Sequence, residues 1–438
     1  MSKKNVLVFP SATYPAMQII DCLKNSPRFH IIAGASYPNH AELVCDDAVT
    51  DIPFLNNEHF LESICKLVEE RKIEYIIPTD DNSALVLTQL RDQIPAVIVC
   101  SPYETARICR YKSLTYERLA GEKYVPVTYS AADVEKGLPY PVFIKPDNSQ
   151  GSRGARLVES KEEMDQIENL EDYVICEYLP GEEYTVDCFT NKDRQVIFCN
   201  PRNRSRIMNG ITARGQSLPL TDEFREVIDS INERIEFRGY WFVQLRRDAH
   251  GKLKLLEVCT RFAGSFAISK GLGANLPLLA LCDFSGLPAS AIVNDYTVIC
   301  DKTYTDRYLI KGLEYDHVFV DYDDTVTCNE GTAVNPYVIA YLYQCRFKKI
   351  KITLITRHKD TFGETLEDSF RRLKIAGDLF DEIIELSWDG TKQDAIQCAD
   401  KSIFIDNSFK ERKEIHDKFG IPVFDVCNID CLFDWRTP

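Results

Sequence analysis

The sequence has no long hydrophobic run, no CxxC pair and no histidine cluster, and each absence argues against a class of protein. No uninterrupted apolar stretch approaches the roughly 20 residues that a membrane-spanning helix requires, so we expect no membrane partner. The 16 cysteines are scattered and the 7 histidines are dispersed, which argues against a zinc site. The start, Met1–Phe9, is too short and wrongly flanked for a secretory signal. We therefore expect reduced thiols and a cytoplasmic location.

Basic residues are too few to balance the acidic ones. The chain has 67 Asp and Glu against 52 Lys and Arg, a formal net charge of -15, which argues against a partner with a phosphate backbone. Nucleic acid is therefore not expected. At 438 residues the chain exceeds the size at which one hydrophobic core usually stops growing, and its composition of 45% hydrophobic and 27% charged residues is that of ordinary globular proteins. We expect two or three domains.

Strand-like and helix-like segments alternate through the first hundred residues. Val6–Phe9 and Ile31–Ala35 are apolar runs typical of buried strands, and Phe60–Arg71 is typical of an amphipathic helix. This alternation predicts an α/β domain with a mostly parallel sheet over residues 1–104. We predict that Ala106–Leu119 is a single helix carrying Lys112, at the start of a second domain over residues 105–312.

A glycine-containing loop follows a strand inside this second domain. The strand carries Lys145, and the loop contributes Gly151, Ser152 and Gly154. Glycines let backbone N–H groups approach phosphate oxygens, and Lys145 adds a positive charge. A Gly-Ser loop is more often only a turn, so a structural interpretation stays open beside phosphate binding.

Two glutamates flank the next turn of the chain, at Pro180-Gly181. Glu177 precedes the turn and Glu183 follows it. They are candidates for contacts with an adenine edge and with ribose hydroxyls respectively. Exposed glutamates at a turn are usually only solvated, and that alternative also stays open.

A hairpin over Tyr240–Phe262 supplies a candidate metal site. If His250-Gly251 forms a two-residue loop, Gln244 lies directly opposite Glu257, with Cβ atoms roughly 5 Å apart on one face. A carboxylate and a carboxamide oxygen so placed suit Mg²⁺, a hard cation. A surface cross-strand hydrogen bond is equally consistent with the pair. Arg261 lies on the same side and is a candidate for contact with a transferring phosphoryl group.

These residues occur in the order, and at nearly the spacing, of the ATP-grasp enzymes, so residues 1 to about 312 resemble an ATP-grasp ligase of the carboxylate-amine ligase and carbamoyl-phosphate-synthase kind. The resemblance implies a small pre-ATP-grasp domain and two α+β lobes that clamp ATP. It further implies that a substrate carboxylate receives the γ-phosphoryl group and that an amine then displaces phosphate. Lys112 and Lys145 would contact ATP phosphates, Glu183 the ribose, and Gln244 with Glu257 the Mg²⁺.

The chain departs from this family at one metal position. Cys259 stands where the family usually has Asn, and a thiol is a poor magnesium ligand. The segment Arg202–Arg206, with Gly210 and Arg214 after it, resembles the family's phosphate and acceptor region. A basic loop on an acidic protein is otherwise usually only surface.

The last third of the chain contains a second set of residues suited to phosphoryl transfer. The apolar run Val318–Val320 leads directly into Asp321 and Asp323, whose side chains share one side of an extended segment. One carboxylate of such a pair can attack phosphorus while the other moves the proton.

Four ordered motifs make residues 313–438 resemble the haloacid dehalogenase superfamily, which implies a Rossmann-like α/β domain. The motifs are Asp321–Thr325, Leu354–Thr356, Lys392 and Ile403–Asn407. By resemblance, Asp321 is the nucleophile and Asp323 the acid and base. Thr356 and Lys392 would hold the phosphoryl oxygens, and Asp321, Asp323 and Asp406 would be the Mg²⁺ ligands.

Two features distinguish this domain from the family pattern. Asp324 replaces the usual glycine after the second aspartate. Only about 30 residues separate Thr325 from Thr356, which leaves no room for a large inserted cap. The domain is therefore predicted to be capless.

These motif sets predict a bifunctional enzyme with ATP and Mg²⁺ as cofactors. An ATP-grasp ligase would join a small-molecule carboxylate to an amine, and a fused phosphatase would act on a phosphorylated substrate or product; a homodimer is one expected assembly. The alternative enzyme is a phosphatase whose ATP-grasp half is a nucleotide-binding regulatory cap. A nucleotide-sensing scaffold without activity is the third alternative.

Overall fold

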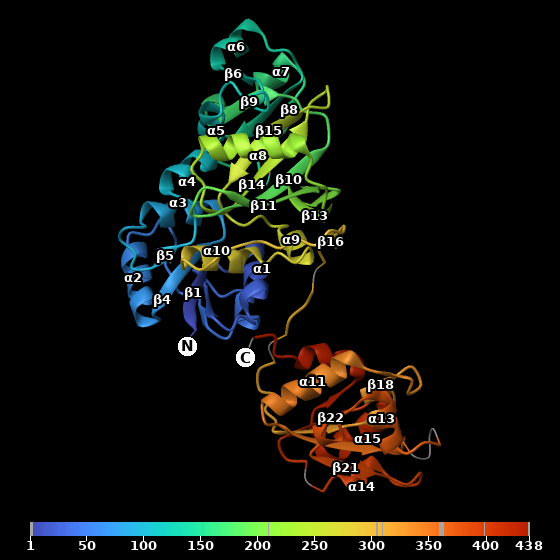
Figure 1. Cartoon of the computed structure of the whole chain (residues 1–438). Helices are drawn as coiled ribbons and strands as arrows, with labels where there is room; N and C mark the ends of the chain where they lie inside the picture. The colour runs from blue at the N-terminus through green and yellow to red at the C-terminus, as the bar shows by residue number, and fades with distance from the viewer. Residues whose placement is uncertain are drawn as a thin grey trace. The chain divides into compact units, whose positions relative to one another are not determined.

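The chain folds into two units, Met1–Tyr304 and Thr305–Arg436 (Figure 1). The computed structural model describes residues 3–149, 151, 153–208, 210–303, 305–308, 310–358, 363–397 and 399–436. No helix in those ranges is long and apolar enough to cross a membrane. The predicted α/β class with parallel sheets is confirmed in both units.

The first sheet of the N-terminal unit is parallel, in the order β3-β2-β1-β4-β5. Its strands are Lys4–Phe9 (β1), Phe29–Gly34 (β2), Ala48–Val49 (β3), Ile73–Pro78 (β4) and Val97–Ile98 (β5). Leu7 and Phe9 of β1 pack against Phe60 and Ile64, which belong to helix α2, Phe60–Glu70. Short 3-10 helix η1 spans His40–Leu43.

Two further helices begin where strands of this sheet end. Helix α1, Tyr14–Leu23, is capped by the Thr13 hydroxyl, which accepts a hydrogen bond from Ala16 N, and Pro15 occupies its first turn. Helix α3, Asp81–Gln89, begins with a capping box of Asp80 and Ser83. Thr13 and Asp80 are thereby fixed at the carboxyl edge of the sheet.

The segment predicted as one helix over Ala106–Leu119 is two helices. They are α4, Tyr103–Arg110, and α5, Lys112–Arg118, separated by Tyr111 in an extended conformation (φ -109°, ψ 120°). The break is stabilised from outside the segment, because Lys112 N donates to the Asp147 carbonyl at 3.1 Å and Ser113 N to the Asp147 carboxylate at 2.7 Å. Lys112 consequently begins a helix, and its side chain lies close to the strand that carries Lys145.

Two antiparallel sheets follow in the same unit. The smaller has the order β6-β9-β7-β8, and the larger has the order β11-β10-β14-β15. Their strands are β6 Thr128–Tyr129, β7 Val142–Pro146, β8 Arg156–Val158, β9 Tyr173–Glu177, β10 Glu183–Thr190, β11 Val196–Asn203, β14 Gly239–Arg247 and β15 Leu253–Cys259.

Short helices border these sheets, and a third sheet completes the unit. The helices are α6 Ala131–Lys136, α7 Lys161–Met164, η2 Leu170–Asp172, α8 Asp222–Arg234, α9 Ala267–Gly271 and α10 Leu276–Phe284. The third sheet has the order β12-β13-β16, with strands Arg206–Met208, Ile211–Gln216 and Ile299–Asp301.

The β14–β15 hairpin has the predicted pair but not the predicted turn. Gln244 pairs with Glu257, whereas Arg247 pairs with Leu253, and the register shifts between Gln244 and Leu245. The connection is one residue longer than a two-residue loop, because Asp248 N donates to the Lys252 carbonyl. Leu256 is the extra residue of a bulge in β15. The bulge compensates for the longer loop, so Gln244 still pairs with Glu257.

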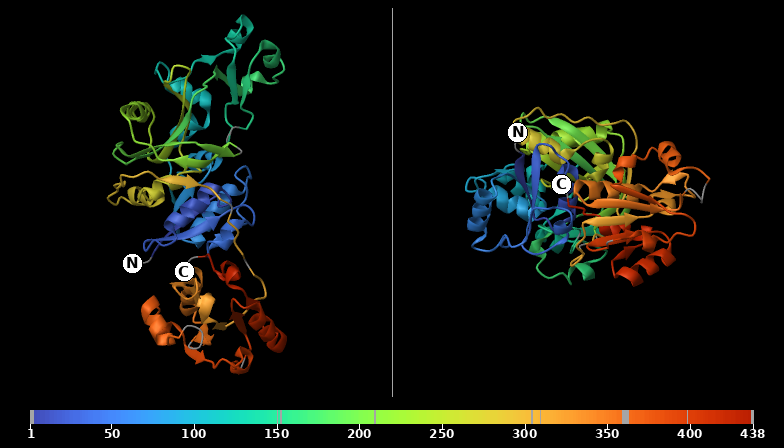
Figure 2. Two further views of the ribbon diagram at one scale, coloured as in Figure 1. Left: turned by 90° about the vertical axis from the view of Figure 1, so that its right-hand side faces the viewer. Right: turned by 90° about the horizontal axis from the view of Figure 1, so that it is seen from below.

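The C-terminal unit is a parallel sheet with helices on both faces, seen from three directions in Figures 1 and 2. The order is β21-β20-β17-β22-β23, with strands Glu382–Glu385, Lys351–Thr356, His317–Val320, Ser402–Ile405 and Val423–Phe424. Val318 and Val320 pack against helix α11, Pro336–Phe347. Phe319, between them, packs with Ile415 of α15, Phe409–Phe419.

The remaining elements of this unit are short. A π-helical turn, η3 Tyr322–Val326, follows β17 and leads into the hairpin β18 Thr327–Cys328 and β19 Ala333–Val334. The others are α13 Leu366–Leu373, η4 Gly377–Leu379, α14 Lys392–Ala395 and η5 Val426–Leu432.

Candidate functional site

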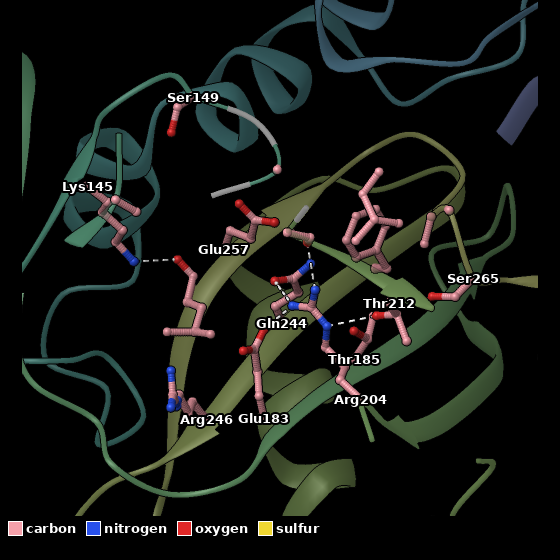
Figure 3. A pocket seen from close by; sticks show the side chains of 18 of the residues that line it. Lys145, Ser149, Glu183, Thr185, Arg204, Thr212, Gln244, Arg246, Glu257 and Ser265 are labelled. Carbon is pink, nitrogen blue, oxygen red and sulfur yellow. Dashed lines mark hydrogen bonds and ion pairs between the residues drawn. The ribbon is translucent and has the colours of Figure 1, made fainter. Parts of the chain in front are cut away.

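A cavity of about 450 Å³ in the N-terminal unit collects most of the residues predicted to bind ATP and metal (Figure 3). The predicted residues that line it are Lys112, Lys145, Gly151, Glu177, Glu183, Gln244, Glu257 and Arg261. Ser152 lies outside the described residues, and Gly154 does not line the cavity. Gly154 has φ +74°, and a methyl group there would come within 2.8 Å of the Pro146 ring, so this turn requires glycine.

Two buried lysines supply the positive charge of the cavity. Lys112 Nζ donates to the carbonyls of Pro146, Asp147 and Ser149 at 3.2–3.3 Å. Lys145 Nζ donates to the Tyr116 hydroxyl at 2.6 Å and to the Leu256 carbonyl at 2.9 Å. Burial lowers the pKa of both ammonium groups. Neither forms an ion pair with a carboxylate of the described chain, so both charges are available to phosphate oxygens.

The predicted metal ligands differ in how the protein holds them. No described residue donates a hydrogen bond to the Glu257 carboxylate or forms an ion pair with it. The Gln244 carboxamide oxygen accepts a hydrogen bond of 3.1 Å from Arg204 Nη1. An unpaired carboxylate in a half-buried position beside a carboxamide oxygen fits a hard divalent cation.

Arg204 also lines the cavity, where its guanidinium group lies beside Glu183 and Gln244 (Figure 3). It forms an ion pair with Glu183, the predicted ribose ligand, and also donates to the Thr212 hydroxyl at 2.8 Å and to the Gly210 carbonyl at 2.9 Å. The specific pairing was not predicted, although the arginine-rich segment around it was. Its guanidinium is therefore placed between Glu183 and Gln244.

Glu177 and Arg261 also have protein partners. The Glu177 carboxylate accepts a hydrogen bond of 2.9 Å from Val127 N, which fixes it against β6. Arg261 forms a bidentate ion pair with Asp81, with both N–O distances at 3.1 Å. Although burial opposes the charge, Asp81 holds the pKa of Arg261 above its usual value. No sequence pattern connects positions 81 and 261, so this pair was missed.

Cys259, the departure from the family's Asn, is buried and does not line the cavity. Burial raises the pKa of its thiol well above the usual value. A neutral, buried thiol does not serve as a magnesium ligand. Gln244 and Glu257 are thus the residues available for a metal ion on this hairpin.

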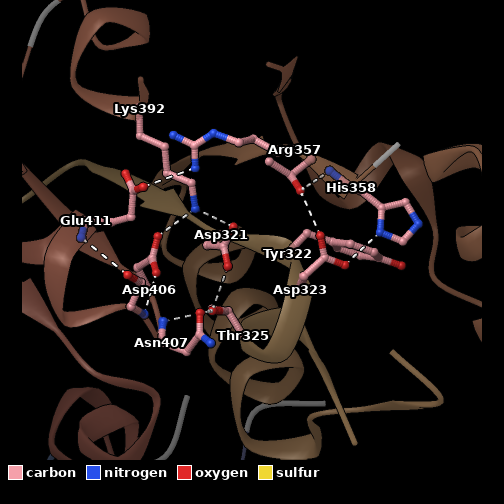
Figure 4. A network of polar contacts seen from close by, with 12 residues as sticks. Asp321, Tyr322, Asp323, Thr325, Arg357, His358, Lys392, Asp406, Asn407 and Glu411 are labelled. Carbon is pink, nitrogen blue, oxygen red and sulfur yellow. Dashed lines mark hydrogen bonds and ion pairs between the residues drawn. The ribbon is translucent and has the colours of Figure 1, made fainter. Parts of the chain in front are cut away.

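The C-terminal unit brings Asp321, Lys392 and Asp406 together (Figure 4). They come from the end of β17, the start of α14 and the end of β22, which meet at the carboxyl edge of the sheet. Lys392 Nζ lies 2.5 Å from Asp321 Oδ1 and 2.7 Å from Asp406 Oδ2. Burial raises the pKa of Asp321 to about 7, while Lys392 opposes the shift and Asp406 adds to it.

Asp323 is held by a separate set of contacts. Its Oδ2 accepts a hydrogen bond of 3.3 Å from the Thr356 hydroxyl, and its Oδ1 lies 2.7 Å from His358 Nδ1. His358 was not predicted; its position two residues after the motif Leu354–Thr356 is the signal that was available. No group of three His, Cys, Asp or Glu side chains in the described ranges converges as a metal site. Asp323 thus contacts Thr356 and His358, whereas Asp321 and Asp406 both contact Lys392.

Asp324 has a left-handed backbone conformation, with φ +53° and ψ 17°. Glycine would adopt this conformation without steric cost, because it has no Cβ atom. Aspartate tolerates this conformation better than most residues. Asp324 Oδ1 also accepts a hydrogen bond of 3.3 Å from Glu330 N, which ties the π-helical turn to the following hairpin.

Comparison with known proteins bears on the N-terminal unit. Residues 169–303 match the family described as ATP-grasp in the biosynthetic pathway with Ter operon. The chain is similar to the D-alanine–D-alanine ligase of Clostridium perfringens (strain SM101 / Type A), with 35% identity over 118 residues, or 24% of this chain and 39% of that ligase. The chain thus spans well under half the length of this relative.

Solved structures share the fold. The biotin carboxylase domain of Hydrogenobacter thermophilus 2-oxoglutarate carboxylase, in complex with MgADP, ADP and bicarbonate, has a TM-score of 0.56 and 21% identity over 68% of this chain and 74% of that chain. N5-Carboxyaminoimidazole synthetase from Staphylococcus aureus, complexed with ADP, has a TM-score of 0.53 and 17% identity over 67% and 80%. The matched family and these structures support the ATP-grasp fold that was predicted for the N-terminal unit.

Proposed function

We propose that the chain is an ATP-dependent carboxylate-amine ligase with a fused, magnesium-dependent phosphatase. The observation that carries the ligase is one cavity that holds Lys112, Lys145 and Glu257, none of which forms an ion pair with another described residue. The matched family and the ADP-bound structural relatives support the nucleotide as the cavity's ligand. ATP would enter as a substrate, with its phosphates toward Lys112 and Lys145.

The ligase reaction divides into two displacements. An oxygen of the substrate carboxylate attacks the γ-phosphorus, the bond to the β-γ bridging oxygen breaks, and ADP leaves. The amine nitrogen then attacks the acyl carbon, and inorganic phosphate leaves with the carboxylate oxygen. Lys112 and Lys145 neutralise the phosphoryl charge, and Arg261, oriented by Asp81, offers its remaining N–H groups to the transferred group.

The C-terminal unit would act as a phosphomonoesterase. Asp321 attacks phosphorus, and Asp323, oriented by His358 and Thr356, protonates the leaving alcohol and then takes a proton from the attacking water. Lys392 neutralises the nucleophile and the phosphoryl oxygens. Mg²⁺, bound by Gln244 with Glu257 in the first unit and by Asp321 with Asp406 in the second, would supply charge neutralisation at each site.

A second candidate function is a phosphatase regulated by nucleotide binding in the ATP-grasp half. Arg204 favours it, because its ion pair with Glu183 and its hydrogen bond to Gln244 use groups that the ligase assigns to ribose and metal. In this alternative the nucleotide binds without turnover. The two functions differ in whether ADP forms when a carboxylic acid is added.

The test supplies ATP with a panel of carboxylic acids and amines, including phosphorylated amines, and follows ADP, phosphate and product mass. The wild-type chain is compared with Glu257→Gln and Asp321→Asn. We expect ADP to form only when a carboxylic acid is present, and Glu257→Gln to abolish this ADP formation. In Asp321→Asn alone, either a phosphorylated ligation product or an unused phosphorylated substrate should accumulate. Nucleotide binding without acid-dependent ADP formation would leave the regulatory alternative instead. Unchanged phosphate release and product in Asp321→Asn would refute the fused phosphatase.

A further inference from the structure

One buried cation near the cavity has no partner in the site described above. Lys302 follows β16, and its backbone N–H donates to the Ala213 carbonyl at 2.8 Å. Its Nζ atom is buried, yet it has no hydrogen-bond partner in the described part of the chain. A buried ammonium group without a hydrogen bond is costly unless another group offsets its loss of water.

No carboxylate in the described ranges forms an ion pair with Lys302. Its Nζ lies 4.3 Å from the centroid of the Tyr14 ring, which offsets only part of the cost. The neighbouring carboxylate, Asp301, is paired with Arg206 and Arg214 instead. Burial, with Arg202 adding to it, lowers the pKa of Lys302 to about 8.

This cation lies against the wall of the cavity. Tyr14 and Gly264, which both line the cavity, are its neighbours, and a Cβ atom at Gly264 would lie 3.6 Å from Lys302 Nζ. Glycine at 264 therefore leaves room beside the ammonium group for an atom the size of a Cβ, which would contact Lys302 Nζ and Ile211 Cγ2, each at 3.6 Å. Ser265, the next residue, and Lys145 lie on opposite sides of the cavity in Figure 3. The phosphate-binding lysine and Lys302 are thus associated with different ends of the cavity.

We propose that Lys302 binds an anionic group, a carboxylate or a phosphate ester, of the acceptor substrate. This inference rests on the proposed ligase, because it assigns the end of the cavity away from Lys145 to the second substrate. The anion enters the space at Gly264 and accepts a hydrogen bond from Lys302 Nζ, with Tyr14 forming the opposite side. The acceptor would accordingly carry a negative charge that Lys302 recognises.

Calorimetry on the full chain saturated with MgADP tests this site, because the nucleotide then occupies the lysines at the other end. Malonate and inorganic phosphate are the probes, and Lys302→Met is compared with the wild type. Lys270→Met, which removes an exposed lysine of the same lobe, is the control. We expect binding of at least one probe with Kd on the order of millimolar, weakened at least about tenfold by Lys302→Met and unchanged by Lys270→Met.

The probes distinguish the two ligand classes. Malonate binding alone assigns a carboxylate, and phosphate binding alone assigns a phosphate ester. NMR of the protein with ¹³C-dimethylated lysines provides a second readout. The signal that is absent in Lys302→Arg belongs to Lys302. This signal should shift when the probe binds, and the pKa of Lys302 should rise. Equal probe binding in the wild type and Lys302→Met, or an unmoved Lys302 signal, would overturn the site even if MgADP binds. Failure of MgADP itself to bind would instead count against the proposed ligase.

Discussion

Replacing Glu257 with glutamine should separate metal binding from nucleotide binding. The substitution keeps the shape and removes one charge from a carboxylate that has no partner in the described chain, so little folding stability should be lost. A charge-assisted ligand contributes about 1.5–3 kcal/mol, which predicts that MgADP binds about 10- to 100-fold more weakly. Metal-free ADP should bind as well or better, by up to about 1 kcal/mol, because the substitution removes an anion from the cavity that holds Lys112 and Lys145.

Calorimetric titration of ADP with Mg²⁺ or with EDTA measures both effects on one protein preparation. Glu226→Gln, an exposed change on α8, is the matched control and should bind MgADP like the wild type. We expect Mg²⁺ to strengthen ADP binding much less in Glu257→Gln than in the wild type. An undiminished effect of Mg²⁺ in Glu257→Gln would refute the assignment of Glu257 as a magnesium ligand.

Two other substitutions test the proposed phosphate contact of Lys145 and the backbone conformation of Asp324. Lys145→Met should weaken ADP binding at least about tenfold with or without Mg²⁺, whereas exposed Lys252→Met should not; equal affinities in calorimetry would contradict the role of Lys145. Asp324→Gly should stabilise the chain against urea by roughly 0.5 kcal/mol, because φ is +53° there, and Asp324→Ala should destabilise it. A destabilised glycine variant would show that the Asp324 hydrogen bond to Glu330 outweighs the backbone preference.

The hairpin shows what sequence reasoning can reach and by what route. Pairing of Gln244 with Glu257 was predicted from a two-residue turn, but the turn is one residue longer and a bulge compensates for it. Side-chain alternation and the requirement that both polar groups leave the core favour this pairing whatever the turn. The alternation of apolar runs with helix-like segments likewise predicted the parallel sheet of residues 1–104, because its strands are almost continuous apolar runs.

Contacts between distant segments were not accessible from the sequence. The break at Tyr111 depends on Asp147, which accepts hydrogen bonds from the start of α5 across more than thirty positions. The Asp81–Arg261 pair joins the start of α3 to the segment after β15, and the Arg204–Glu183 pair depends on how the β12–β13 hairpin packs. Such pairs leave no periodic pattern, whereas His358 lies two residues after the motif Leu354–Thr356 and could have been considered from the sequence.

Isotope transfer from a labelled acid tests the central claim most directly. The Asp321→Asn chain, which should lack phosphatase activity, is given ATP, an amine and a carboxylic acid labelled with ¹⁸O in its carboxylate. If the carboxylate attacks the γ-phosphorus and the amine then displaces phosphate, the released phosphate carries one carboxylate oxygen, and mass spectrometry should find it labelled. Unlabelled phosphate, or ADP formation that does not depend on the acid, would contradict the account.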